Sequence, residues 1–226
     1  EFIRQFITLR GYENVLNGAW VTLRIAVFGL LIGIAIGTLI AVVRVMPKYK
    51  LLPRILDKIC VCYIALFRGT PMVVQLLIGY WVLLPALGIT VDSGVPVAII
   101  VFGLNSGAYV SEIMRGGIQS VDAGQMEAGR AVGLTYATTM LRIVVPQAIK
   151  NILPTLANEL VTMVKESSIC STIGMMDLMW GARNVAATTF ISVGPFMVAA
   201  LIYFCINYPA GKAIEAIEGR MRRGDK

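Results

Sequence analysis

The stretch from Gln125 to Pro146, QMEAGRAVGLTYATTMLRIVVP, decides the fold, because it is the longest polar-flanked segment in an otherwise apolar chain. Asp122 and Gln125 have the spacing of a capping box, which predicts that a helix starts there. Gly133 is placed to end this helix in the left-handed conformation, and Thr135 to cap a second helix. Pro146 is expected to stop or kink that second helix. Two short helices joined at a glycine fit either a rigid lever between membrane spans or a plain capped loop.

The same stretch carries a family pattern. Glu127-Ala128-Gly129, followed at fixed spacing by Gly133, Ile143 and Pro146, resembles the EAA loop of bacterial ABC importer permeases. Two positions differ from the family pattern: Gly129 replaces an Ala and Val145 replaces a Leu, and both substitutes are apolar and of modest size. In that family the loop is the coupling helix, which docks in a groove of a cytoplasmic ATPase. The resemblance therefore implies ATPase-coupling roles for Glu127, Ala128, Gly129, Gly133, Leu134, Thr135 and Pro146.

The composition indicates an integral membrane protein. Hydrophobic residues make up 57% of the 226 residues and charged residues 15%, whereas soluble domains are ~45–50% apolar. The chain has no histidine, and its four cysteines lack CxxC spacing, which argues against a zinc site, a haem or a His-based triad. The net charge of +7 could suggest nucleic acid. The Lys and Arg residues, however, cluster beside apolar spans, as the positive-inside rule expects, so no nucleic-acid partner is predicted.

The apolar stretches predict an all-α polytopic membrane protein that forms a single transmembrane domain, residues 1–226. An interfacial helix is expected at residues 1–17, an amphipathic lead-in to the second span at 51–66, and a cytoplasmic coupling loop at 120–147. Five spans are expected at about residues 19–43, 67–87, 95–116, 152–173 and 190–210. Most Lys and Arg residues then lie on segments predicted to be cytoplasmic, which places the N-terminus outside and the C-terminus in the cytoplasm. Residues 174–190 are expected outside.

Two other segments carry patterns with a structural meaning. Gly29, Gly33 and Gly37 lie four residues apart, which predicts a face for close helix packing, either within the chain or between two copies. The FRGTP sequence at 67–71, with a Gln at 75, resembles a segment of polar amino acid importer permeases of the histidine, glutamine, arginine and cystine type. Pro71 is expected to bend the helix and to free backbone carbonyls.

A further run resembles the same family. Residues 108–118 match its AYxxExxRGGI pattern. Glu112 and Arg115 are three residues apart, and we expect them to form a structural ion pair near the cytoplasmic face.

Polar residues in or beside the spans are candidates for the substrate path, because ionisable groups in hydrocarbon usually face a cavity or a partner. One group is Arg68, Thr70 and Gln75, and the other is Lys165, Glu166, Ser167 and Ser168. Arg68 suits a substrate carboxylate and Glu166 a substrate ammonium. Alternatively, Arg68 snorkels to lipid phosphates, and Lys165 and Glu166 lie at the outer mouth or pair as part of a gate. The amino acid carried stays open, because Arg68 and Lys165 oppose the charge of Glu166.

The resemblance implies the fold of an ABC type I importer permease in the bacterial inner (plasma) membrane. It also implies three protein partners: a second permease subunit, identical or paralogous, an ABC ATPase subunit, and an extracellular binding protein that delivers a polar amino acid. The chain has no nucleotide-binding motif, so ATP and magnesium are expected on the ATPase, and no catalytic, cofactor-binding or metal residue is predicted here. An ion-gradient-driven transporter and a membrane scaffold or enzyme subunit are the alternatives. The first usually shows repeated halves and the second needs a catalytic constellation, and the sequence shows neither.

Overall fold

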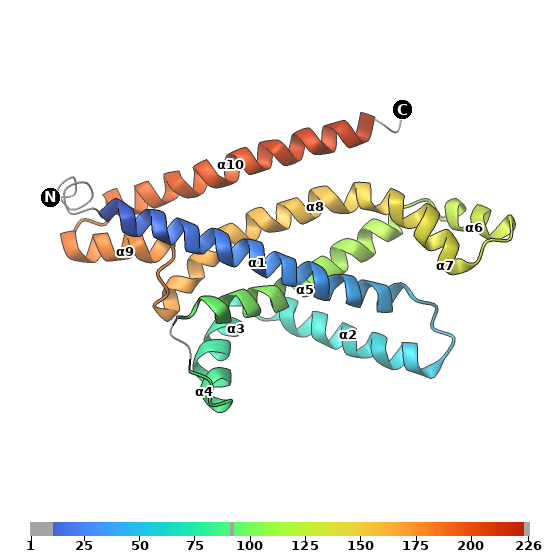
Figure 1. Ribbon diagram of the computed structural model, residues 1–226, viewed down its shortest axis with the longest axis horizontal. Coiled ribbons are helices and arrows are strands. Elements are labelled where there is room, and N and C mark those ends of the chain that lie inside the picture. The colour runs from blue at the N-terminus through green and yellow to red at the C-terminus, as the bar shows by residue number, and fades with distance from the viewer. Residues whose placement is uncertain (1–10, 91–92, 224–226) are drawn as a thin grey trace.

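The chain is built from helices throughout the part that the structure describes. The computed structural model describes residues 11–90 and 93–223, and no strand occurs in these two ranges, which confirms the all-α prediction. The long helices run alongside one another (Figure 1) and are α1 (Gly11–Val45), α2 (Leu51–Gly69), α5 (Val95–Gln119), α8 (Val145–Glu166) and α10 (Val193–Arg223). The shorter elements are α3 (Met72–Ile78), η2 (Gly79–Leu83), α4 (Leu84–Ala86), α6 (Ala123–Ala131), α7 (Tyr136–Thr139), η3 (Met140–Val144), η4 (Ser167–Ile173) and α9 (Leu178–Thr189).

Helices α1 and α5 pack closely because glycines line their contact. A Cβ on Gly33 would lie 2.7 Å from Ser106 Oγ, and one on Gly37 would lie 2.7 Å from Val110 Cβ, both closer than real atoms come. On the other helix, a Cβ on Gly103 of α5 would lie 2.6 Å from Ile32 Cγ2 of α1. The predicted glycine face is therefore used for packing within the chain, and because it is buried there it does not contact a second copy.

The second predicted span is two helical segments that meet at a sharp bend. Residues 51–69 form one continuous helix, and residues 72–86 continue at an angle of 104° to it. The bend that Pro71 was expected to cause is thus observed. Residues 67–69, which were expected to begin the second span, belong to α2, because α2 continues through Gly69 before the chain changes direction.

Proline also explains a wide turn further along this segment. Pro85 cannot donate a backbone hydrogen bond. The preceding turn η2 is π-helical, and the N–H of Leu84 donates to the carbonyl of Gly79. The helix therefore passes the proline without ending there.

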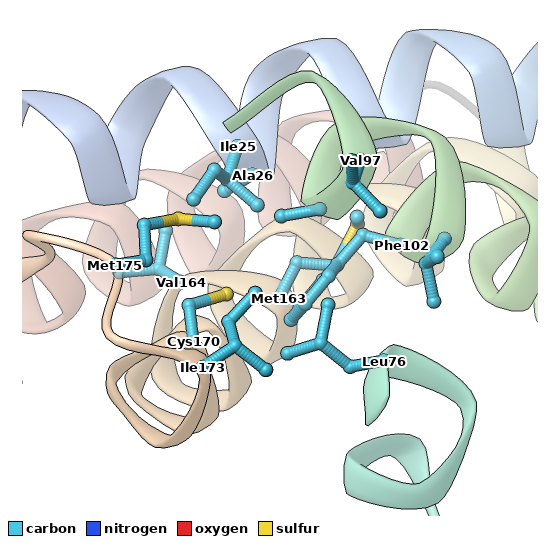
Figure 2. Packing of buried hydrophobic residues seen from close by; sticks show 12 residues of the cluster. Ile25, Ala26, Leu76, Val97, Phe102, Met163, Val164, Cys170, Ile173 and Met175 are labelled. Carbon is cyan, nitrogen blue, oxygen red and sulfur yellow. The ribbon is translucent and has the colours of Figure 1, made fainter. Parts of the chain in front are cut away.

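The apolar core lies where α1, α3, α5, α8 and η4 meet (Figure 2). Ile25 of α1, Phe102 of α5 and Met163 of α8 are almost fully buried in this cluster. The remaining members are Ala26, Leu76, Val97, Ala98, Val101, Val164, Cys170, Ile173 and Met175. The cluster fixes the short segments α3 and η4 against the long helices, since Leu76 and Ile173 both belong to it.

Helix α9 is anchored at its first turn by Asp177. The Asp177 carboxylate accepts a hydrogen bond from Trp180 N at 2.7 Å and is fully buried. Gly18 of α1 allows this approach, because a Cβ there would lie 2.5 Å from the Asp177 carbonyl oxygen. Burial raises the pKa of Asp177 from its ordinary value of 3.8 to about 7.

Two of the predicted segments do not coincide with single observed helices. Within the described residues, three helices are long and apolar enough to cross a membrane, namely Gly11–Val45, Val95–Gln119 and Val193–Met221, and a fourth span results if the bent pair counts as one. The fourth expected span, 152–173, falls on α8 and η4, which are not in this set; α8 carries a polar face. Residues 11–17 belong to α1 and not to a separate interfacial helix, while residues 1–10 lie outside the described part.

The segments predicted to be cytoplasmic lie toward one end of the molecule. The connection between α1 and α2 and the pair α6 and α7 lie together at the right of Figure 1. The C-terminal end of α10 points the same way, whereas α9 and the start of α1 lie at the opposite end. The arrangement is the one that the charge distribution predicts for a membrane protein with its basic segments on one side.

Candidate functional site

Residues 122–139, which we call the α6–α7 elbow, form two short helices at one end of the molecule (Figure 1). Asp122 caps α6 as expected, since its side chain accepts a hydrogen bond from Gly124 N at 2.6 Å. The expected capping box is wrong in its second half. Gln125 accepts from Gln147 Nε2 at 3.2 Å, which joins the start of α6 to the start of α8.

The turn between the two helices is a complete Schellman motif around Gly133. Gly133 has φ +87°, which is the left-handed conformation predicted for it. Gly133 N donates to Arg130 O and Leu134 N to Gly129 O, each at 3.1 Å. Thr135 then caps α7, because its hydroxyl accepts from Thr138 N at 3.2 Å. These bonds make the elbow a rigid turn, as the lever interpretation requires.

The packing of α6 on α7 explains why residue 129 is a glycine where the family pattern has an alanine. It is buried against α7, and a Cβ at this position would lie 2.4 Å from Thr139 Cγ2 and 2.9 Å from Thr139 Oγ1. Thr139 is fully buried and donates its hydroxyl hydrogen to Thr135 O at 3.0 Å, so it has little room to move. The glycine therefore lets α6 and α7 pack directly on each other.

Pro146 does not end the second helix. The chain passes from α7 through the π-helical turn η3 into α8, and Val145 N donates to Met140 O across this wide turn. Because a proline lacks the N–H of a regular helix, the wide turn before it accommodates the missing bond. The elbow is thus joined to α8 by uninterrupted helical structure.

The elbow presents a mixed surface away from the helices that it packs on. Glu127, Ala128 and Arg130 are exposed, and Val132 is 76% exposed. Behind this surface, Tyr136 donates to the carbonyl of Val45 at 3.0 Å, at the end of α1. Burial, and then the neighbouring Tyr49, raises the pKa of Tyr136, so its hydroxyl stays protonated and can donate at neutral pH.

The second group of interest surrounds the bend at Pro71. Phe67 O has no helical donor because residue 71 is a proline. Gln75 Nε2 donates to this carbonyl at 2.8 Å and Asn105 Nδ2 at 3.2 Å. Gln75 also donates to Thr70 Oγ1 at 2.8 Å. Two candidates for the substrate path, Thr70 and Gln75, are therefore engaged in holding the bend.

Arg68 lies one turn from this bend and faces α5. Its guanidinium lies 5.2 Å from the centre of the Tyr109 ring and 4.0 Å from Glu112 Oε2. Glu112 also accepts from Arg115 at 2.6 Å, which is the expected ion pair. The side chain of Arg68 is 44% exposed, so contacts with α5 leave part of it accessible.

The third group of candidates, residues 165–168, lies at the end of α8, and its members differ in how far they are buried. Lys165 is exposed and Ser168 half-buried, and both line an open, largely apolar cavity of about 540 Å³ with Met179, Phe196, Ala199, Ala200 and Tyr203. Ser167 is fully buried and donates to Val164 O at 2.8 Å. Glu166 is half-buried. Lys165 and Ser168 therefore share a cavity with room for a small molecule, while Ser167 is used inside the fold.

Helix α8 carries a polar face that the sequence analysis missed. The face, which we call the α8 polar stripe, has helical spacing and is exposed along its whole length; its residues are Asn151, Thr155, Asn158, Thr162 and Lys165. Beside it, Glu159 is half-buried and accepts from Ser106 Oγ at 3.1 Å. An ionisable residue in the middle of the fourth predicted span was the available signal for Glu159. Among the described residues no group of His, Cys, Asp and Glu side chains could hold a metal ion.

Comparison with known proteins places this architecture among transport proteins. Residues 29–223 match the family model described as "Binding-protein-dependent transport system inner membrane component". The chain is 37% identical over 211 residues to the arginine transport system permease protein ArtQ of Bacillus subtilis, covering 93% of this chain and 94% of that protein. It is 39% identical over 207 residues to the putative glutamine transport system permease protein GlnP of Rickettsia conorii, covering 92% of each. A solved amino acid ABC transporter with histidines matches with a TM-score of 0.87 and 34% identity, over 97% of this chain and 98% of that one.

Proposed function

Because this chain belongs to the family of binding-protein-dependent transport system inner membrane components, we propose that it is the membrane subunit of an ATP-driven importer of a polar amino acid. Its relatives include an arginine and a putative glutamine transport permease, and the solved neighbour is an amino acid ABC transporter. These relatives are transport subunits and not enzymes. The family description supports a location in the bacterial inner membrane.

The observation that carries the proposal is the rigidity of the α6–α7 elbow. The elbow is capped at both helices, closed by the Schellman motif at Gly133 and packed without a gap at Gly129. Its exposed surface, which includes Glu127 and Val132, is then a suitable contact for a separate ATPase that binds ATP and magnesium. Movement of that ATPase would reach α8 directly, because η3 joins α7 to α8 in continuous helical structure.

A polar path is supported by the α8 polar stripe. A charged side chain costs ~2.5–3.5 kcal/mol in the middle of a membrane on insertion scales, and such residues usually face a cavity or a partner. A second permease subunit, identical or paralogous, that placed its own stripe opposite this one would enclose an aqueous route. The extracellular binding protein would deliver the amino acid to the outer end of this route.

Two chemical features of the path suit an amino acid. Glu159 and Glu166 are carboxylates that suit the substrate ammonium, and Lys165, with Ser168 beside it in the cavity, suits the substrate carboxylate. Arg68 is engaged with Tyr109 and Glu112, which supports a role in holding α2 more than a role in binding substrate. Transport then follows by alternating access: ATP binding brings the two elbows together and opens the spans outward, and hydrolysis resets the inward-open state.

Reconstitution tests the proposal against the ion-gradient alternative. The chain is purified with its ATPase and second subunit, placed in proteoliposomes, and supplied with loaded binding protein. ATP on the side of the elbow should drive uptake, and an ionophore that collapses ion gradients should leave uptake unchanged. If no ATPase co-purifies, or if uptake follows an imposed ion gradient without ATP, the proposal is wrong.

The path residues are tested by removing one negative charge at a time. Glu159→Gln and Glu166→Gln should each raise the apparent KM for uptake about tenfold, as expected for the loss of one charge-assisted hydrogen bond of ~1.5–3 kcal/mol. Glu215→Gln, in the exposed ion pair with Lys212, is the matched control. A variant that retains ATPase coupling with unchanged affinity and uptake would remove its residue from the path.

A further inference from the structure

Glu112 stands at the junction of three helices, where it contacts three arginines. It lies on α5 with its side chain 19% exposed. Its Oε1 accepts from Arg44 Nη1 of α1, its Oε2 accepts from Arg115 Nη2 at 2.6 Å, and Arg68 Nη1 of α2 lies 4.0 Å away. One carboxylate therefore ties the end of α1 and the end of α2 to α5.

Arg44 has a second acidic partner on α2. Its Nε lies 3.8 Å from Asp57 Oδ1, while the other oxygen of Asp57 is 2.7 Å from Lys48 Nζ. Both Arg44 Nε and Asp57 Oδ1 are buried and have no hydrogen-bond partner. Buried polar atoms are nearly always paired, and a distance of 3.8 Å is too long for a hydrogen bond. Arg44 is thus bonded to Glu112 through Nη1, while its Nε faces Asp57 Oδ1 across a gap that a shift of about 1 Å would close.

This cluster lies between two elements that the transport cycle must connect. On one side, Val45 follows Arg44 directly, and its carbonyl accepts the hydrogen bond from Tyr136 of the α6–α7 elbow. On the other side, Arg68 lies three residues before Pro71, where the second span bends by 104°. Each step along this route is a hydrogen bond, an ion pair or a run of at most three residues of the chain.

We propose that the Glu112 cluster, formed by Arg44, Asp57, Arg68, Glu112 and Arg115, transmits movement of the α6–α7 elbow to the bend at Pro71. Its members are positioning residues: none needs to touch the amino acid or ATP. A pull on the end of α1 changes how Arg44 is divided between Glu112 and Asp57, which shifts α2 and the bend relative to α5. The proposal rests on the proposed function, since it assumes an ATPase at the elbow.

The test measures amino acid taken up per ATP hydrolysed, in the complete complex in proteoliposomes. Glu112→Gln removes the charge that holds three arginines and keeps the size of the side chain. We expect this ratio to fall at least about fivefold, while the ATPase still co-purifies and hydrolyses ATP at a similar rate. Glu215→Gln, in the exposed pair with Lys212, should leave the ratio unchanged.

A purely structural role for Glu112 predicts a different result. Loss of stability would lower the yield, the melting temperature, uptake and hydrolysis together, and the ratio of uptake to hydrolysis would stay constant. A constant ratio therefore overturns the inference, whether both activities fall or neither does. If instead the wild-type complex has no associated ATPase, the proposed function fails first, and the inference fails with it.

A double-mutant cycle tests whether the elbow and the cluster act in series. Tyr136→Phe removes only the hydroxyl that donates to Val45 O. If both contacts lie on one route, the combination of Tyr136→Phe and Glu112→Gln should be little worse than the more severe single variant. If the two losses multiply, as for independent sites, the elbow does not act through Glu112 and the inference is wrong.

Discussion

The packing of Gly129 against Thr139 gives the sharpest test of the rigid elbow. In Gly129→Ala the new Cβ would lie 2.4 Å from Thr139 Cγ2, whereas ordinary contact begins at 3.4 Å. Helix α6 must therefore move away from α7 by about 1 Å, because Thr139 is buried and bonded to Thr135 O. Overpacking of this kind costs ~1–3 kcal/mol, more than the ~0.5–1 kcal/mol that alanine gains over glycine within a helix.

A net cost of about 1.4 kcal/mol would make the elbow with α6 packed against α7 about tenfold less populated relative to an elbow in which the two helices have separated. The Gly129→Ala subunit should therefore insert in the membrane and assemble with its partners, but its uptake per ATP hydrolysed should fall by a similar factor. The measurement is substrate uptake and phosphate release in the same proteoliposomes. Gly211→Ala on α10 is the control, because a Cβ there meets nothing within 4 Å.

A second substitution distinguishes this clash from a general effect of the added methyl group. Thr139→Ala removes the two closest atoms, and the next nearest is Thr139 Cβ, at 3.2 Å. Thr135 O retains its bond from the backbone N–H of residue 139, so the loss of the hydroxyl is tolerated. Combined with Gly129→Ala, this change should restore most of the coupling. Normal transport by Gly129→Ala alone, or no recovery in the double variant, would refute the reasoning.

Three further predictions concern other positions. Gly133→Val should leave membrane insertion intact and uncouple hydrolysis from uptake, because φ +87° costs an L-residue ~1–2 kcal/mol; unimpaired uptake would contradict the rigid turn. Gln75→Leu should lower the melting temperature, since losing the donor to Phe67 O and Thr70 costs ~1–3 kcal/mol, and should leave the KM for uptake unchanged. A raised KM with unchanged stability would instead place Gln75 on the substrate path. Asp177 has a pKa raised to about 7 in the fold, so its contribution to stability is fully present below its ordinary pKa of 3.8 and is lost as the pH rises through about 7. The melting temperature should therefore fall from about pH 5 to about pH 8 in the wild type and less in Asp177→Asn; equal pH dependence in the two proteins would count against a buried, protonated carboxyl.

The local signals in the sequence were sufficient to predict the caps and the turn of the α6–α7 elbow. A cap, a glycine at a left-handed position and a proline each act on the few residues beside them, so Asp122, Gly133 and Thr135 could be assigned without tertiary information. The bend at Pro71 was predictable for the same reason, because the missing N–H is a property of the residue itself. The EAA pattern also predicted the family, that of binding-protein-dependent importer permeases, and the family match confirms this prediction.

Other features depended on what lies opposite each residue. The sequence showed that Gly29, Gly33 and Gly37 share a face, but only the fold showed that α5 covers it. The same holds for Gly129, whose need for a glycine comes from Thr139, and for the α8 polar stripe, which has a meaning only because that side of α8 is exposed.

The ion pairs show most clearly which contacts could be predicted from the sequence and which depended on the fold. Glu112 and Arg115 are three residues apart and were predicted to pair from helical geometry alone. Arg44 and Arg68 reach the same carboxylate from positions 68 and 44 residues away, and Asp57 faces Arg44 from a third helix. The sequence alone therefore determined the caps at Asp122 and Thr135, the turn at Gly133 and the bend at Pro71, because these depend on neighbouring residues. The tertiary structure decided which side chains meet, because that depends on how the helices pack.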